Sequence, residues 1–383
     1  MGIDLVPSTD QFRPPDSRPA EPRPSVERRP GPSTEEADAF RPVASAVLDF
    51  VERELKSPTE KIGKPPEVLE RFLSERDGPI AAIESVLLRG AEIQWEMDVT
   101  RGSQALLPNG QGLIRLQRLL VARALVEARR GEPEQAVQTL AASWSLVEVL
   151  SRRPESLAYV LVLSDAKLIA GAIRKVDSPA YGWAERLRSL SLLSGFYAAF
   201  QNQAWYSPAQ GDDLTGKAGA YGRFLREMIE EVRRMDLCDW TPERLDEART
   251  RSWRELQTEG NFVPAAPNQL ESFQRWRRYV VEAELTALIL DARAERAAAR
   301  DHSWPEKLST LGAGVCGGAG WSYRRSANGT ATFAFEGRLA ERESRALQLP
   351  MTFTAGTPVT PTPRPASKPT PRPTPRSAPT ARR

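Results

Sequence analysis

The pattern of apolar and polar positions is helical over most of the chain. Hydrophobic side chains recur at intervals of three and four residues, which is the spacing that lines one face of an α-helix. The first helix is predicted to begin behind Ser33 as its N-cap, with Glu36 three residues later, as in a capping box. A second, short helix is opened by Pro65 and Pro66, and a third is expected to end at Gly90.

A helical hairpin is predicted over residues 112 to 151. Gly131 separates two helical stretches, where it is expected to act as a C-cap, and Pro133 begins the second arm. The phrase ALVEARRGEPEQAVQTL is similar to the inner part of a tetratricopeptide repeat, with Gly131 at the turn and Ala136 and Leu140 at packing positions. No second copy follows at the expected period of about 34 residues. Consecutive helical hairpins remain the simplest prediction for the helices that follow, at about 155–176, 183–206, 218–237 and 241–257.

The longest predicted helix runs from Gln269 to about Arg300 and is apolar on two sides. A helix with two apolar faces is covered on both of them. One stripe contains Val280, Ala283, Ala287 and Leu290, and the other contains Val281, Leu285 and Leu288. A further helix is predicted to open at Ser303, with Pro305 early in its first turn and a buried face formed by Leu308 and Leu311.

A β-meander is predicted after residue 320. A three-residue loop that ends at Gly329 pairs Tyr323 with Phe333 and Trp321 with Phe335, so that all four rings share one buried face. A two-residue loop would place the rings of the two strands on opposite faces. The stripe expected to cover the rings is the one with Val280, Ala287 and Leu290. A third, edge strand is predicted from the alternation of Leu347, Leu349, Met351 and Phe353 around Pro350.

The 383 residues include 32 prolines, which are concentrated at the two ends of the chain. Such segments bury too little apolar surface to offset the entropy of ordering, so both ends are predicted to be disordered. The fold class is therefore mainly α: antiparallel helical hairpins, then a long helix packed on a small three-stranded antiparallel meander. The predicted parts are a proline-rich segment (1–37), a helical-hairpin domain (38–260), a helix-plus-meander module (261–356) and a basic tail (357–383).

Composition excludes several classes of protein. Cys238 and Cys316 are the only cysteines, too few for a disulfide framework and without the spacing of a zinc or redox site. His302 is the only histidine, which removes most metallohydrolase and serine or cysteine hydrolase schemes. We therefore expect no cofactor and no metal. The chain as written contains no apolar stretch of about 18 residues, so it is expected not to span a membrane and to be cytoplasmic.

The strongest candidate for catalysis is the group Glu96, Asp98 and Arg101, next to a run that alternates like a strand from Ile93 to Val99. The two carboxylates lie on one side of that strand and could perform acid–base chemistry or hold a cation. A solvated strand face with an ion pair is favoured over this interpretation. Three weaker candidates are each given a structural interpretation first: the loop with Asp212 and Asp213, His302 beside Asp301, and Trp205 with Tyr206.

The tail carries cations without acids. Its proline at nearly every second position favours an extended polyproline-II conformation. A line of positive charge on such a spacer attracts polyanions weakly and with strong salt dependence, although a tail without a partner is favoured slightly. The candidate polyanion contacts are Arg364, Lys368, Arg372, Arg376, Arg382 and Arg383.

Two resemblances add expectations about location. The order of elements over residues 270–354, including the phrases SWPEKLSTL and WSY, resembles the packing scheme of the C-terminal globular part of type II secretion pseudopilins. The phrases WEMD, RG and LPN, with the hairpin and WPEKL, resemble a group of bacterial helical proteins that have no assigned activity. Members of that group often begin with a membrane segment, which implies a place in the cell envelope if this chain has one upstream.

These observations favour a non-catalytic scaffold, of the cytoplasm or the cell envelope, whose helical hairpins bind a protein partner. Two alternatives stay open. One is a component of a secretion apparatus, and the other is a hydrolase or transferase that uses the region of Glu96, Asp98 and Arg101.

Overall fold

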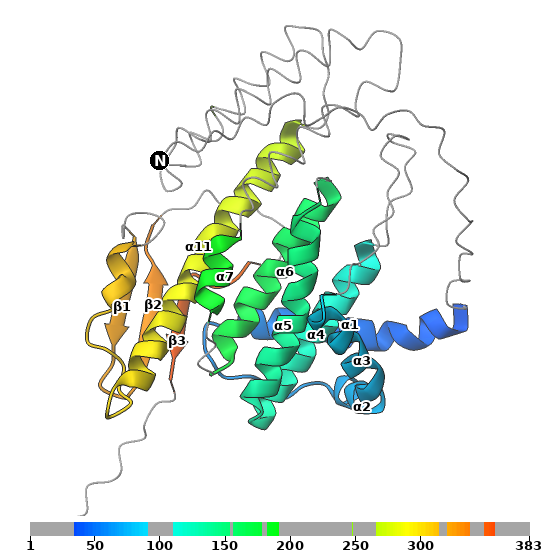
Figure 1. Cartoon of the computed structure of the whole chain (residues 1–383), viewed down its shortest axis with the longest axis horizontal. Helices are drawn as coiled ribbons and strands as arrows, with labels where there is room; N and C mark the ends of the chain where they lie inside the picture. Colours follow the sequence, from blue (N-terminus) through cyan, green and yellow to red (C-terminus); the bar gives the residue numbers. More distant parts are fainter. Residues whose placement is uncertain are drawn as a thin grey trace, which may run out of the picture. The chain divides into compact units, whose positions relative to one another are not determined.

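The protein is mainly helical, with one small antiparallel sheet (Figure 1). The computed structural model describes residues 34–90, 110–153, 156–177, 182–190, 247, 266–313, 320–337 and 348–356. Contacts divide the chain into two compact units, residues 1–42 and residues 43–383. The buried cores belong to the second unit, which therefore combines the helices and the sheet.

Three helices open the described part of the chain: α1 (Thr34–Lys56), α2 (Glu67–Glu75) and α3 (Asp77–Leu88). Their positions confirm the sequence prediction. Helix α2 starts after Pro66, whose φ of −60° already suits the entry to a helix, and α3 is followed by Gly90 with a φ of 71°. Phe50, Val51 and Leu55 form the buried face of α1 because they recur at helical spacing.

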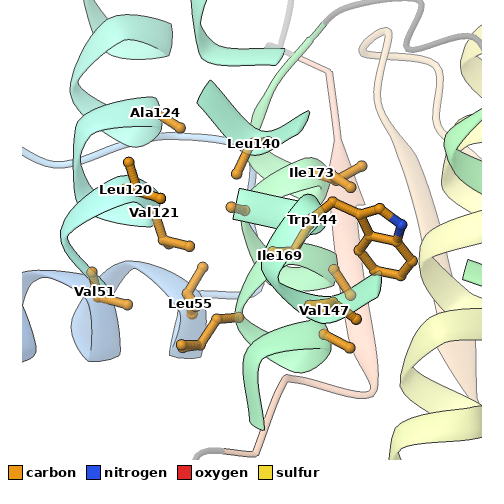
Figure 2. Packing of buried hydrophobic residues seen from close by; sticks show 14 of the residues in the cluster. Val51, Leu55, Leu120, Val121, Ala124, Leu140, Trp144, Val147, Ile169 and Ile173 are labelled. Carbon is orange, nitrogen blue, oxygen red and sulfur yellow. The ribbon is translucent and has the colours of Figure 1, made fainter. Parts of the chain in front are cut away.

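The predicted hairpin is formed by α4 (Gly110–Arg130) and α5 (Pro133–Ser151). Gly131 has a φ of 82°, and the Glu132 N–H donates to the Glu127 carbonyl at 3.0 Å, as in a Schellman C-cap. Helix α6 (Ser156–Lys175) packs against both arms. The core between these helices and α1 is shown in Figure 2, where the labelled residues are Val51, Leu55, Leu120, Val121, Ala124, Leu140, Trp144, Val147, Ile169 and Ile173.

Helix α7 (Trp183–Ser189) and the long α11 (Ala266–Ala298) complete the helical layer, and α11 packs on both α6 and α7. Of the helix predicted over 183–206, only the part up to Ser189 is described. The predicted helix at 218–237 and the strand at 93–99 lie outside the described residues. So does the helix at 241–257, except for residue 247, which is helical.

The sheet consists of β1 (Trp321–Arg325), β2 (Ala331–Phe335) and β3 (Thr352–Ala355), in the order β1-β2-β3. The predicted register is confirmed: Tyr323 is opposite Phe333, and Trp321 is opposite Phe335. Gly329 has a φ of 82°, as the three-residue loop requires. The ring centroids of the two pairs are 5.2 and 5.0 Å apart, respectively.

The stripe of α11 that covers the sheet differs from the predicted one. Val281, Leu285 and Leu288 pack with the aromatic residues of the sheet. Leu290 and Val280 instead belong to the hydrophobic core between the helices. The prediction that α11 is covered on two sides is thus confirmed, but the assignment of its two faces was wrong. Both stripes are apolar, so hydrophobicity alone does not distinguish their partners.

The helix predicted at Ser303 does not form there. The residues up to Leu308 are not helical, and only a short 3₁₀ helix, η4 (Ser309–Ala313), follows. Two tertiary contacts explain the difference: Trp304 is buried in the core under the sheet, and the Tyr323 hydroxyl donates to the Pro305 carbonyl at 2.7 Å. That carbonyl would otherwise accept a bond within the helix.

The third strand is shorter than predicted. It begins at Thr352, and Leu349 is buried in the cluster of the helices instead of the sheet; Leu347 lies outside the described residues. On the edge of β3 that faces away from β2, the Thr354 N–H donates to the Pro58 carbonyl at 2.8 Å, and Thr59 forms a parallel bridge with Thr354. The edge expected at the third strand is therefore covered by the segment after α1.

Candidate functional site

Most residues that the sequence singled out lie outside the described part of the chain: Glu96, Asp98, Arg101, Trp205, Tyr206, Asp212, Asp213 and the six cations of the tail. His302 is described. It is exposed, has a φ of 50°, and its N–H donates to the Ala299 carbonyl at 3.1 Å, so its backbone ends α11. The Asp301 carboxylate accepts the Ser303 N–H at 3.1 Å. These contacts give both residues a structural role at the end of α11, and not at the helix start that the sequence suggested.

The structure shows a carboxyl cluster where α3, α4 and α5 meet. Glu127 lies one turn after Arg123 on α4, and Arg123 Nε is 2.8 Å from Glu127 Oε1 and 3.2 Å from Glu84 Oε1 on α3. Thr139 Oγ1 on α5 is 3.1 Å from Glu84 Oε1 and 2.9 Å from Glu127 Oε2. The Arg123 guanidinium also reaches Asp77, at the start of α3, at 2.9 Å.

Burial raises the pKa of both glutamates in this cluster, against the lowering effect of Arg123 and Thr139. Two carboxyls with raised pKa values are a common feature of acid–base catalysts. Here, however, Glu127 is 5% exposed and both carboxyls contact side chains of neighbouring helices. The arrangement therefore links three helices through groups that can bind a proton.

A second polar network joins α6 and α11 to the segment that leads into β3. Arg174 is 1% exposed and donates to Thr286 Oγ1 and to the Pro350 carbonyl, both at 2.8 Å, and to the Glu282 carbonyl at 2.5 Å. The Glu282 carboxylate accepts the Leu349 N–H at 2.9 Å and lies 2.8 Å from Arg278 Nε. Lys167 Nζ is 3.4 Å from the same carboxylate.

The network continues at the end of α6. Arg293 donates to the carbonyls of Ile173 at 3.1 Å and Val176 at 2.9 Å, which are groups that the end of a helix leaves without partners. It also pairs with Glu60, whose other oxygen accepts the Gly356 N–H at 2.6 Å. The charged side chains of this network form hydrogen bonds with backbone groups of residues 349–356 and so fix the position of that segment. We call this network the clamp.

Two polar residues of α6 were missed by sequence reasoning. Asp165 is fully buried, burial raises its pKa well above the usual range, and neither carboxyl oxygen has a hydrogen-bond partner among the described residues. Lys167 is buried as well, which lowers its pKa. The signal was present: both interrupt the apolar run from Tyr159 to Ile173. A charged residue inside such a run is buried only with a compensating partner or a shifted pKa.

Helix α3 has an apolar face that remains exposed. Ile80 and Leu87 are buried, while Ile83 is 39% and Val86 is 43% exposed. Ala82, also exposed, precedes Ile83 and lies one turn from Val86, so these three side chains form one stripe. We call this stripe the α3 face. It was not anticipated from the sequence, because apolar residues predominate around the helix and its polar residues are confined to Asp77, Glu84 and Ser85.

Arginines stand beside the α3 face. Arg76, directly before the helix, and Arg89, directly after it, are both exposed. They therefore lie at the two ends of the helix that carries the stripe. The face thus combines an apolar centre with a positively charged border.

Within the described ranges, no group of His, Cys, Asp and Glu is suited to hold a metal ion, and no helix is long and apolar enough to cross a membrane. Five described tryptophans are buried, as expected for packing: Trp144, Trp183, Trp276, Trp304 and Trp321. Comparison of the chain with protein-family models, with curated proteins and with solved structures found no match.

Proposed function

We propose that the protein is a non-catalytic scaffold, of the cytoplasm or the cell envelope, that binds a protein partner through the α3 face. The observation that carries the proposal is the exposure of Ile83 and Val86 on one side of an ordered helix. Apolar groups that gather on a surface are a common mark of a protein-binding site, because covering them releases free energy.

The attachment of α3 supports this role. Ile80 and Leu87 anchor the helix on the core, and Arg123 contacts it at Asp77 and Glu84. A helix held in this way is ordered before the partner arrives, so less conformational entropy is lost on binding.

The border of the face defines the chemistry of the partner. An amphipathic helix with an apolar stripe would cover Ala82, Ile83 and Val86. Carboxylates beside that stripe would complement Arg76 and Arg89, which increases the association rate and selects against basic partners. We therefore propose an acidic amphipathic helix as the bound element.

The test replaces two residues of the face, as Ile83→Asp with Val86→Asp, in the full chain. Proteins that the wild type captures from a lysate of its own cells are quantified by mass spectrometry. We expect at least one captured protein to fall about tenfold or more with the double variant, because two charges would be buried against an apolar surface.

The matched control is Ala81→Asp, an exposed position of the same helix that lies off the stripe and away from Arg89. It adds a charge to α3 and should leave capture unchanged. An identical set and amount of captured proteins for the wild type and the double variant would refute the role of the α3 face. Circular dichroism of all three proteins establishes that the comparison concerns folded chains.

A further inference from the structure

The carboxyl cluster beneath α3 has fewer protons than contacts when both glutamates are ionised. The Thr139 hydroxyl has one proton but lies within hydrogen-bonding distance of both Glu84 and Glu127, at 3.1 and 2.9 Å. Arg123 Nε donates its one proton to Glu127 at 2.8 Å and forms an ion pair with Glu84 at 3.2 Å. Two protons therefore serve three hydrogen-bonding contacts.

One added proton completes this arrangement. If Glu84 is protonated, its O–H donates to Thr139 Oγ1, and the hydroxyl proton of Thr139 is then directed to Glu127. The reverse assignment satisfies the same atoms. The added proton also removes the repulsion between two carboxylates that a hydroxyl bridges, a situation in which one carboxyl is held protonated.

We propose that Glu84 and Glu127 share one proton while α3 is seated on the α4–α5 hairpin, and that loss of this proton loosens α3. The loosening of α3 is a form of regulation and rests on the proposed function, because it makes partner binding at the α3 face respond to pH. Glu84 lies directly after Ile83, one of the residues of that face, so the proton and the partner act on the same helix.

The surrounding charges agree with this direction. From α3, Asp77 raises the pKa of Glu84; from α4, Arg123 lowers the pKa of both glutamates; from α5, Thr139 lowers both by hydrogen bonding. Burial is the largest effect on each glutamate and raises its pKa. Since the folded protein binds the proton more tightly than the unfolded chain, stability is highest below the ordinary pKa of glutamate and falls as the pH rises through the raised value.

The experiment uses the full chain labelled with ¹³C at the glutamate carboxyl carbons. We expect one proton to be lost above the ordinary range of glutamate, in signals that Glu84→Gln and Glu127→Gln each alter. Titration of every glutamate in the ordinary range would overturn the shared proton. This measurement on the wild type is independent of how well any variant folds.

Hydrogen exchange tests the loosening of α3. After correction for intrinsic rates, the protection of the amides of residues 80–88 should fall about tenfold for each unit by which the pKa is raised, as the pH increases from the ordinary glutamate pKa of 4.5 to 8.5. Glu127→Gln should flatten this profile, whereas Glu148→Gln, an exposed position on α5, should not. Parallel profiles for the wild type and Glu127→Gln would contradict the proposal.

The two proposals fail separately. A raised carboxyl titration together with protein capture that Ile83→Asp and Val86→Asp leave intact would refute the α3 face and retain the shared proton. Capture that depends on the α3 face but is equal at pH 4.5, the ordinary pKa of glutamate, and at pH 8.5 would refute the regulation.

Discussion

Gly131 has a backbone conformation that few other residues tolerate. Its φ of 82° lies in the left-handed region, and a Cβ added there would meet no atom within 4 Å. Any cost of substitution is therefore conformational and not steric. We expect Gly131→Val to lower the free energy of unfolding by about 1 to 2 kcal/mol, because a β-branched side chain is strained in this region.

Gly78, near the start of α3, provides the control for Gly131→Val. A Cβ at that position also meets nothing within 4 Å, but its φ is not positive. Gly78→Val should therefore change stability by only a few tenths of a kcal/mol. Urea denaturation measures both variants, and equal midpoints for Gly131→Val and the wild type would contradict the C-cap.

Arg174 makes a second prediction possible at the scale of the residue. Its replacement by Met removes the donors to Thr286, Pro350 and Glu282. The Glu282 carbonyl keeps the Thr286 hydroxyl as a donor, whereas a buried acceptor left without any donor costs about 1 to 3 kcal/mol. Part of this cost is offset because no charge remains to be buried. We expect a net loss of about 2 to 3 kcal/mol in the free energy of unfolding, measured by urea denaturation.

Lys56 allows a comparison with Arg174. It pairs with Glu52 at 2.9 Å, but its side chain is 56% exposed. An exposed ion pair contributes about 0 to 1 kcal/mol, so Lys56→Met should have a small effect. Similar losses for the two variants would show that the clamp on residues 349–356 adds little.

At the scale of the element, the segment after α11 shows how a tertiary contact overrides a local signal. Ser303, Pro305 and Glu306 have the order of a helix start, yet the Pro305 carbonyl accepts the Tyr323 hydroxyl at 2.7 Å. Tyr323→Phe removes this donor. We expect it to lower the free energy of unfolding by about 1 kcal/mol, measured by thermal or urea denaturation.

Tyr279 is the control for Tyr323→Phe. Its hydroxyl is buried and has no hydrogen-bond partner among the described residues. Burying a hydroxyl without a hydrogen-bond partner destabilises the folded state, because the group loses its bonds to water. Tyr279→Phe removes that hydroxyl and should therefore be neutral or stabilising. If both variants lost the same stability, the loss would reflect packing and not the bond to Pro305.

The basic tail belongs to the scale of the whole molecule. Its six cations, from Arg364 to Arg383, stand without acids after Thr357. We expect the full chain to elute from heparin at a higher salt concentration than a chain ended at Gly356, because each cation that contacts a polyanion releases counterions. Ending the chain there keeps the bond between the Gly356 N–H and Glu60.

A full-length variant with glutamine at all six positions separates the effect of charge from that of length. It should elute with the shortened chain. Equal elution of the wild type and the shortened chain would show that the tail is an end without a polyanion partner.

The sequence by itself determined the features that depend on neighbouring residues. Helical periodicity defined α1 to α6, a glycine ended α4, and Gly329 with the alternating aromatics determined the register of β1 and β2. These features could be predicted because the chain conformation and the side-chain period act over a few residues.

Only the tertiary structure decided which surfaces meet. The two apolar stripes of α11 are chemically alike. Which stripe packs on the sheet and which on α6 therefore depends on how well the packed surfaces fit one another. The carboxyl cluster joins Glu84 to Thr139 across 55 positions, and the clamp joins Arg174 to Pro350 across 176. In the sequence, Glu84, Thr139 and Arg174 look like ordinary polar positions on the surface of a helix. Burial shifts their pKa values and directs their hydrogen bonds, and burial is a property of the assembled fold.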